Sequence, residues 1–582
     1  MTPLRILFAI PSPEYLRYYD ATIRLLAERG HAVAVTIARQ KEAKQARLDG
    51  LISGDVTFAG FLPPRTGLWR ELANDVRGTM DFIRYLDPRF ASAGALRDRM
   101  KRKALPWYLH WLDRQASVPT ASVQRWLHRL TAVERAIPDQ RDLTAFLAEQ
   151  SPDVIVISPL VEAGGAQVDL VKSARALGVP SVVGIASWDN LTNKGLLRIQ
   201  PDAVMLWNEA QKREAIELHG IAPESIVVTG AQPFDRWFGR QPTRSRDEFC
   251  RRVGLPADRP IVLFTGSSVF ISRGDAEVPF VRRWIQALRT SARPTLRAAV
   301  VLMRPHPYNA DQWRDVDLSG LGTVAVWPRG RHNPVDEDNR ADYFDSLFYS
   351  AAVVGINTSA MVEATILGRP VLSIQADEFA RTQEGTLHFH HLLPENGGFL
   401  RLATTLEQHV TQLEEVLERP EVVQRQLASF VASFLRPHGL TQPAVPIVAD
   451  TLESVARVAH ARHAAATALA PARFALAPLA VFCLAAEKAA PLAKLSKEPK
   501  KLAARVARLA FKWPHRARLT SRHYTRTARK QGKATVVYGY RGGLRMAARA
   551  ARLLVIRPLR VSRRVAARVL AVAAGRPSEP RL

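Results

Sequence analysis

The stretch AVVGINTSAMVEATILGRPVLSI, residues 352–374, decides the fold class of this chain. Its first five residues are apolar and predict a buried strand, and a helix is expected to follow from residue 359. Gly368 and Pro370 end that helix, and residues 371–374 predict a second buried strand. Two apolar strands joined by a helix are typical of a parallel sheet with helices on both faces, so the sequence predicts an α/β fold.

The polar turn inside this stretch, Asn357, Thr358 and Ser359, precedes the predicted helix. A helix N-terminus offers unpaired N–H groups and the positive end of the helix dipole, which together favour an anion. Glu363 follows one turn later on the same face. The turn is therefore a candidate phosphate site of a nucleotide, with Glu363 at the ribose. The alternative is an ordinary capped helix in which Glu363 closes a capping box.

The same alternation of strands and helices recurs along the chain. It predicts two doubly wound, Rossmann-like domains that face each other across a cleft, with ligands beyond the carboxyl ends of the strands. The expected domains are residues 1–240 and 255–445, joined by a polar, Arg-rich linker over 236–259, with a helix at 446–460 crossing back. The expected strands are residues 4–10, 31–38, 152–158, 178–185, 203–207 and 226–230, then 260–268, 298–303, 323–327, 352–356 and 371–374.

Residues 63–148 interrupt this alternation and predict a helical insertion rich in Trp, Arg and Leu. Residues 107–112, Trp-Tyr-Leu-His-Trp-Leu, are its most aromatic part, and residues 100–103 form a local basic cluster. The aromatic side chains are expected either at an ordinary helix interface or on a surface that faces a membrane or an acceptor.

The net charge of +28 is concentrated at the C-terminus. Residues 451–582 hold 29 Lys and Arg against 4 Asp and Glu, whereas the first 450 residues hold 53 against 50. Apolar residues recur at helical spacing among these cations, which predicts a basic amphipathic tail over 461–582. An anionic membrane surface is the expected partner. The alternatives are nucleic acid, which we consider the less favoured partner, and a solvated tail with no partner.

Cysteine content and hydropathy bear on the compartment. The two cysteines, Cys250 and Cys483, indicate neither a disulfide framework nor a metal cluster, and a reducing cytosol is expected. The apolar run at residues 4–10 ends at Pro11 and does not resemble a secretory signal. No window predicts a transmembrane helix, because the nearest one, residues 464–486, contains Arg473 and two prolines.

Two further motifs of the second domain follow predicted strands. Arg304-Pro305-His306-Pro307 places a guanidinium and an imidazole where they can bind phosphate oxygens, and His306 can also donate a proton. A packed loop histidine is the alternative. Ser267 and Ser268 follow Gly266 and offer hydroxyls to a phosphate, although no Walker A motif is present. These loops and the turn at 357–359 are expected to converge at one edge of the sheet.

The first domain offers two carboxylates that are candidate general bases. Glu14 lies in the first strand-to-helix loop, where it is expected to face the cleft, or to be a solvated side chain. Asp189 follows Trp188 after another strand, and suits base catalysis, sugar recognition or a turn-stabilising role. No metal-ligand spacing, Gly-x-Ser-x-Gly elbow or Rossmann glycine motif is found.

Taken together, these motifs resemble the two-domain GT-B glycosyltransferase superfamily, and most closely its capsule-polysaccharide and CDP-glycerol glycerophosphotransferase-like members. The resemblance rests on residues 29–35, 220–235, 304–307, 357–363 and 368–370. It implies that His306, Thr358, Ser359 and Glu363 bind a nucleotide donor, and that the first domain binds the acceptor and supplies the base. It implies no metal and no cofactor besides the donor. The first loop departs from the pattern because it lacks the glycine-rich turn of many members.

The expected function is therefore transfer of a glycosyl group from a nucleotide-activated donor to an acceptor hydroxyl, which is lipid-linked or part of a polymer, in cell-surface polysaccharide synthesis. The enzyme is expected in the cytoplasm, peripheral on the inner face of the cell membrane. The alternatives are a glycerophosphotransferase of the same fold, a UDP-sugar 2-epimerase, and a non-catalytic scaffold that binds nucleotide sugars.

Overall fold

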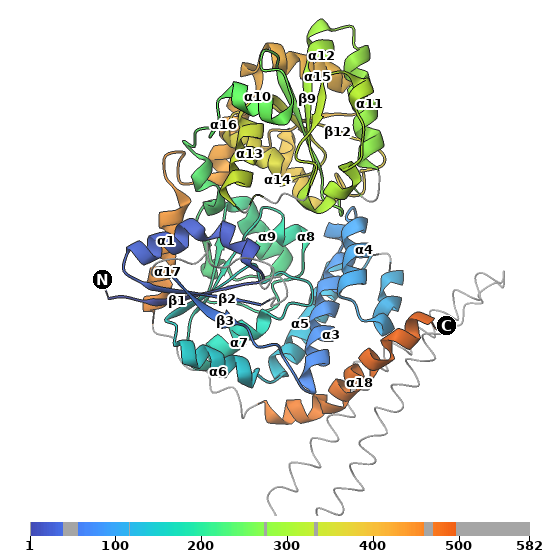
Figure 1. The fold of residues 1–582 in the computed structure, drawn as a ribbon. Coiled ribbons are helices and arrows are strands. Elements are labelled where there is room, and N and C mark those ends of the chain that lie inside the picture. The colour runs from blue at the N-terminus through green and yellow to red at the C-terminus, as the bar shows by residue number, and fades with distance from the viewer. Residues whose placement is uncertain are drawn as a thin grey trace, which may run out of the picture.

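The computed structural model describes residues 2–38, 56–115, 117–272, 276–330, 334, 336–458 and 469–495. It confirms the predicted fold class, since two parallel sheets with helices on both faces stand one above the other in Figure 1. The first sheet has seven strands in the order β3-β2-β1-β4-β5-β6-β7. These are β1 (Arg5–Ile10), β2 (Ala32–Ile37), β3 (Val56–Phe61), β4 (Val154–Ile157), β5 (Ser181–Gly184), β6 (Ala203–Leu206) and β7 (Ile226–Val228).

The second sheet has six strands in the order β10-β9-β8-β11-β12-β13, again all parallel. These are β8 (Ile261–Thr265), β9 (Val300–Arg304), β10 (Val324–Val326), β11 (Ser350–Gly355), β12 (Val371–Ile374) and β13 (Arg401–Ala403). The helices around it are α10 (Arg246–Val253), α11 (Glu277–Thr290), α12 (Pro294–Ala298), α13 (Glu337–Phe348), α14 (Ser359–Ile366), α15 (Leu406–Glu418) and α16 (Glu421–Phe430).

Alternate residues of each central strand enter the two cores on either side of the sheet. In β1, Ile6 and Phe8 pack on the side of α1 (Asp20–Glu28) and α17 (Ala444–Arg457). Leu7 and Ala9 pack on the opposite side, with α6 (Arg141–Gln150) and α7 (Val168–Leu177). Because both faces of the sheet are covered by helices, the strand is apolar throughout, and the apolar run in the sequence therefore predicts it.

The region between β1 and α1 contains a short 3-10 helix before α1 begins. A 3-10 helix, Pro13–Tyr18, is followed by a break at Tyr19, and α1 begins at Asp20. Tyr19 is buried, and its hydroxyl donates to the carbonyl of Gly184, 2.9 Å away, and contacts Ser158 Oγ at 2.8 Å. The break therefore ties this segment to the sheet and sets Arg17 at the edge of the cleft between the domains.

The segment between β3 and β4 is helical, with α3 (Trp69–Ile83), α4 (Gly94–Lys103), a 3-10 helix (Trp107–Arg114) and α5 (Thr120–Ala136). A buried ion-pair cluster holds it to the first domain. Arg77 of α3 pairs with Glu134 of α5 at 2.8 Å and with Asp169 of α7 at 2.6 Å.

The aromatic run at 107–112 contacts the last described helix, α18 (Ala470–Leu495), which lies along α3 in Figure 1. The Trp107 indole N–H donates to the carbonyl of Ala486 at 3.1 Å, and Leu476, Ala480 and Cys483 are buried. Within α18, residues Ala472–Pro491 have the length and hydropathy of a membrane span, and 39% of that stretch is buried inside the structure. Residues 496–582, most of the predicted basic tail, lie outside the described residues.

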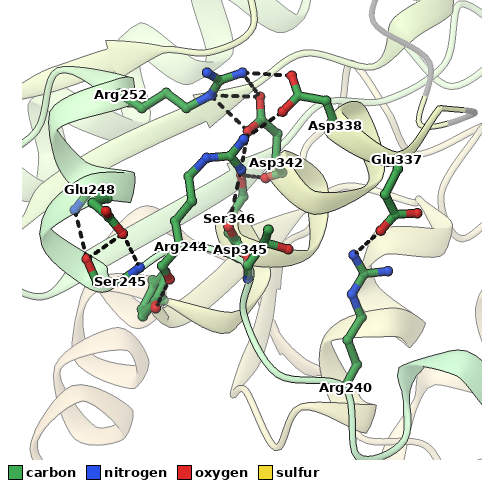
Figure 2. A network of polar contacts seen from close by, with 12 residues as sticks. Arg240, Arg244, Ser245, Glu248, Arg252, Glu337, Asp338, Asp342, Asp345 and Ser346 are labelled. Carbon is green, nitrogen blue, oxygen red and sulfur yellow. Dashed lines mark hydrogen bonds and ion pairs between the residues drawn. The ribbon is translucent and has the colours of Figure 1, made fainter.

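The Arg-rich stretch predicted as a linker contains a folded element of the second domain. Phe249 and Cys250 of α10 are buried in its core, and Ser245 forms a capping box with Glu248 at the start of this helix. Figure 2 shows how the arginines of the stretch meet α13: Arg244 and Arg252 both pair with Asp342 at 2.9 Å. Part of the positive charge of this predicted linker is thus neutralised by the acidic side chains of α13.

The chain returns to the first domain through α17, which packs against α1. Arg29 pairs with Asp450 and Glu453 of α17, at 2.7 Å in each case. The two domains also share apolar packing, since Trp188, Trp207 and Phe234 of the first domain belong to the same buried cluster as the second sheet.

Candidate functional site

A cavity of about 510 Å³ lies between the two domains. Its walls come from the carboxyl ends of strands in both sheets, the place at which doubly wound sheets bind ligands. Among the residues predicted as site residues, the cavity is lined by Asp189, Ser268, Arg304, His306, Asn357, Thr358, Ser359 and Glu363. Glu14 and Ser267 are not among the lining residues.

The turn at 357–359 begins α14 as expected. Thr358 is the N-cap residue with extended backbone, and its side chain makes no capping bond, so its hydroxyl is not used by the helix. Ser359 accepts a hydrogen bond from the indole N–H of Trp188, 3.1 Å from Oγ. Thr358 and Ser359 both line the cavity beside the first-turn N–H groups, an arrangement that suits an anion.

Asn357 serves the fold of the second domain. Its side chain is buried, and its amide Nδ2 donates to the carbonyl of Thr382 at 3.0 Å and to Thr386 Oγ1 at 3.1 Å. The amide N–H groups therefore anchor the segment after β12 beneath the turn. A ligand would meet the backbone of this turn and the hydroxyls of Thr358 and Ser359.

Glu363 faces the cavity one turn into α14 and accepts a hydrogen bond from the hydroxyl of Tyr343. Burial raises the pKa of Glu363 to about 7, although the Tyr343 hydrogen bond and the nearby charges of Arg17 and Arg236 oppose that rise. The capping-box alternative is wrong, because no side-chain cap bond is made at the start of α14. A carboxyl group that titrates near neutral pH can accept a hydrogen bond or a proton from a ligand hydroxyl.

His306 lies on the loop after β9, and its ring orientation follows from one backbone contact. Nδ1 accepts from the backbone N–H of Tyr308 at 3.2 Å, which places the proton of the neutral ring on Nε2. Burial and then the charge of Arg17 lower the pKa of His306 to about 4. At neutral pH the ring is therefore uncharged and offers Nε2–H as a hydrogen-bond donor.

Arg304 lines the cavity but is largely held by α13. Its Nη1 donates to Ser346 Oγ at 3.0 Å and to the carbonyl of Asp342 at 3.4 Å, and the guanidinium lies 5.1 Å above the Tyr343 ring. Burial lowers the pKa of Arg304 to about 10, so it remains a cation at neutral pH. Arg304 therefore contributes positive charge to the cavity, while its hydrogen bonds to α13 fix its position.

The two serines of the Gly266–Ser268 loop have different surroundings. Ser267 is fully buried, and its backbone N–H donates to Glu277 at 2.6 Å, whereas Ser268 lines the cavity. A Cβ at residue 266 would stand 2.8 Å from the backbone nitrogen of His306. Glycine is thus required for this loop to pack against the His306 loop, which brings Ser268 and His306 to one wall.

The two carboxylates predicted as bases occupy different settings. Glu14 accepts a hydrogen bond from the hydroxyl of Tyr308, 2.5 Å away, and so bridges the two domains beside the cavity. Asp189 lines the cavity, but Ser187 Oγ at 2.6 Å and Asn193 Nδ2 at 2.7 Å already donate to it.

Burial would raise the pKa of Asp189, but the neighbouring His388 and Lys194 and the hydrogen bonds from Ser187 and Asn193 lower it to about 2. A carboxylate of such low basicity is a poor general base at neutral pH. Its charge and its fixed orientation suit binding and positioning instead.

Most of the cations in the cavity were not predicted from the sequence: Arg17, Arg99, Lys194, Arg236, Arg240 and Arg340. They come from the 3-10 helix before α1, the helical insertion, the segment after α8 (Asn190–Asn193), the stretch predicted as a linker and α13. No sequence motif marks these cations. Several of them follow first-domain strands whose carboxyl ends face the cleft, and this position is the signal that could have indicated them. His388 was not predicted either, and its ring meets that of Trp188 edge to face at 5.0 Å across the domain boundary.

Among the described residues, no three His, Cys, Asp or Glu side chains are grouped so that they could hold a metal ion. The cavity instead presents guanidinium, ammonium, imidazole and hydroxyl donors. Donors of these kinds form charge-assisted hydrogen bonds with anions.

No family model and no curated protein matches this chain. Similar solved structures include a UDP-GlcNAc 2-epimerase from Neisseria meningitidis bound to UDP-GlcNAc, at 13% identity and a TM-score of 0.45 over 78% of this chain and 100% of that chain. A glycosyltransferase from Rickettsia africae ESF-5 has 9% identity and a TM-score of 0.46 over 78% and 100%. A variant of the wall teichoic acid polymerase TagF has 10% identity and a TM-score of 0.41 over 78% and 90%.

The two parallel sheets are the pair of doubly wound α/β domains that the sequence predicted. The likeness to these solved structures adds nothing about what this chain binds.

Proposed function

We propose that this protein is a transferase that moves a glycosyl group from a nucleotide-activated donor to an acceptor hydroxyl during synthesis of a cell-surface polysaccharide. The observation that carries the proposal is the convergence of three second-domain loops on one cavity. The start of α14, the His306 loop and Ser268 all line it, and each offers hydrogen-bond donors. A nucleoside diphosphate is the ligand class whose charge and shape match such a wall.

In this proposal the second domain holds the donor. The diphosphate lies against Thr358 and Ser359, with Nε2–H of His306 donating to a phosphate oxygen. Glu363, one turn farther along α14, receives hydrogen bonds from the ribose hydroxyls. Negative charge grows on the phosphate as the glycosyl bond breaks, and these fixed donors stabilise it without a metal or any cofactor besides the donor.

The first domain holds the acceptor hydroxyl, whose proton must pass to a base as the new bond forms. The geometry favours neither predicted base. Glu14 is engaged by Tyr308 outside the lining of the cavity, and the hydrogen bonds on Asp189 keep its basicity low. We assign Asp189 to positioning the acceptor. Of the two carboxyl groups that line the cavity, Glu363 is the one with a pKa near neutrality.

We also propose that the enzyme works in the cytoplasm at the inner face of the membrane, where a lipid-linked acceptor would be available. The support is the charge of residues 496–582, which hold 24 Lys and Arg against 2 Asp and Glu. Electrostatic attraction to anionic lipid adds up along such a segment.

The proposal is tested by the thermal unfolding of the full chain with UDP-, GDP-, CDP- and CMP-linked compounds. A donor that binds the native state raises the unfolding temperature in a concentration-dependent way, and the size of the shift ranks the bases. The same series with His306→Ala should give smaller shifts. If no nucleotide shifts the wild-type transition, the proposed function is wrong.

A further inference from the structure

Two cations of the first domain line the cavity and form no ion pair with any acidic side chain that the structure describes. Arg99 of α4 and Lys194 are half-buried and line the cavity. Arg99 donates to Asn193 Oδ1 at 2.5 Å and lies 4.6 Å above the Phe270 ring, and Lys194 Nζ lies 3.3 Å from the hydroxyl of Tyr15. Within the described ranges, neither cation has a carboxylate oxygen within 4.0 Å.

Other cations in the same cavity differ in this respect. Arg236 and Arg340 approach Asp20 at 3.3 and 3.6 Å, and Arg240 pairs with Glu337 at 3.0 Å. Asp189 is close enough to act on both Arg99 and Lys194 electrostatically, and Glu162 acts on Lys194, but the oxygens of Asp189 accept from Ser187 and Asn193. Among the residues that line the cavity only Asp189 and Glu363 are acidic, against seven Arg and Lys.

Arg99 and Lys194 belong to the first-domain wall of the cavity, which faces α14 of the second domain. Trp188 of that wall touches Ser359 at the start of α14, and Asp189 and Lys194 follow Trp188 in the chain. The two cations are therefore supplied by the domain that is proposed to hold the acceptor.

We propose that Arg99 and Lys194 bind an anionic group, a phosphate or a carboxylate, carried by the acceptor. This inference rests on the proposed function, which places the donor diphosphate at the α14 turn and the acceptor beyond it. Half-buried charges without a partner are costly, and a bound anion removes that cost while adding charge-assisted hydrogen bonds. The acceptor is thus an acidic sugar or a phosphorylated polyol, and a neutral saccharide would leave both cations unpaired.

The test is calorimetric titration of the full chain with glucose 6-phosphate, glucuronate and glucose, which distinguish a phosphate, a carboxylate and a neutral ligand. We expect at least one of the anionic sugars to bind about tenfold or more tightly than glucose. Arg99→Gln and Lys194→Gln should each weaken that binding about tenfold, and Lys194→Arg should retain it. Arg102→Gln, which removes the same charge from an exposed position of α4, is the matched control and should change nothing.

Nucleotide titrations of the same variants complete the design. Affinity for a nucleoside diphosphate should stay within about twofold of wild type, because the α14 turn is intact. Equal binding of glucose and the anionic sugars would overturn the inference, as would variants that bind them normally. If the variants lose as much affinity for the nucleotide as for the anionic sugar, Arg99 and Lys194 bind the donor diphosphate instead. If the wild type binds no nucleotide, the proposed function and the acceptor assignment fail together, even if the variants lose anion binding.

Discussion

The indole N–H of Trp188 donates to Ser359 Oγ across the domain boundary, at 3.1 Å. One residue follows a strand of the first sheet, and the other begins α14 in the second domain. Because Ser359 Oγ accepts from the indole, its own proton remains available to a ligand at the helix N-terminus. The same contact holds the two domains together at the point where donor and acceptor are proposed to meet.

Replacing Trp188 with Phe should weaken nucleotide binding modestly. The substitution removes the N–H but keeps a ring against His388, so the loss is that of one hydrogen bond, about 1 kcal/mol, or up to about tenfold in Kd. Calorimetric titration with the nucleotide that stabilises the wild type measures it. Trp111→Phe, in the insertion and outside the cavity lining, is the control. An unchanged Kd for Trp188→Phe would show that the contact does not organise the site.

Replacing His306 with Ala should reduce donor turnover by about 100-fold or more, because a donor aimed at developing negative charge is lost. The thermal unfolding temperature should remain close to that of wild type, since within the described part of the chain the ring is held by a single hydrogen bond, from the backbone N–H of Tyr308. Donor consumption at a saturating donor concentration measures the turnover, and a thermal unfolding scan measures the unfolding temperature. Turnover that persists in a folded variant would remove His306 from the site.

The Glu363 carboxyl group should make nucleotide binding depend on pH. Burial raises its pKa from 4.5 to about 7, so the carboxylate that accepts ribose hydroxyl groups becomes the majority form only above that pH. We expect affinity for the nucleotide to fall about tenfold for each pH unit below about 7. Glu363→Gln should lower affinity at pH 8 and abolish this pH dependence, and an unchanged profile in the variant would contradict the assignment.

The same shift predicts a change in stability with pH. The folded protein binds more protons at Glu363 than the unfolded chain between about pH 4.5 and 7, so this group makes the free energy of unfolding fall as pH rises through that range. Urea unfolding at pH 5 and pH 8 should show a smaller difference for Glu363→Gln than for wild type. A difference of the same size in both would show that the group titrates normally.

The sequence predicted the fold class and the central strands because those strands are buried on both faces and therefore apolar throughout. It did not predict β13 (Arg401–Ala403), which is three residues long and only partly buried, so its composition resembles that of a loop. It also misassigned part of the supposed linker. The arginines of residues 236–259 indicated exposure, and only the fold brings Asp338, Asp342 and Asp345 of α13 against them.

For the site, the sequence located the loops but not the direction of each side chain. Ser267 and Ser268 are adjacent and chemically identical, yet Ser267 is buried, with its backbone N–H on Glu277, and Ser268 lines the cavity. Asn357 turns beneath its own helix for the same kind of reason. The cations of the cavity come from segments that are far apart in sequence, so no local motif predicts them.

Replacing Arg77 with Met should destabilise the first domain by about 3 kcal/mol, because it leaves Glu134 and Asp169 buried without their shared cation. Arg65 also pairs with Asp169 at 2.7 Å and Lys172 with Glu134 at 3.3 Å, which limits the loss to the lower part of the usual range. Urea unfolding measures the change in the free energy of unfolding.

The control for Arg77→Met is Arg135→Met, which removes an exposed arginine from the same helix as Glu134 and should alter stability by less than about 0.5 kcal/mol. Equal effects of the two substitutions would show that the buried cluster contributes nothing specific.

Truncation after residue 495 should release the protein from anionic liposomes while preserving nucleotide binding. The cut removes 24 Lys and Arg but keeps α18, whose Leu476, Ala480 and Cys483 are buried against the insertion. Truncation after residue 460 would also remove α18 and expose that apolar surface, so it should lower the unfolding temperature as well.

Co-sedimentation with phosphatidylserine vesicles at low and high salt measures the binding, and neutral vesicles are the control. The full chain should sediment with anionic vesicles and dissociate as salt screens the attraction, since each basic residue contributes about 1 kcal/mol near such a surface. If the chain ending at residue 495 still sediments as the full chain does, the attachment is made by the folded part, and α18 becomes the segment to test.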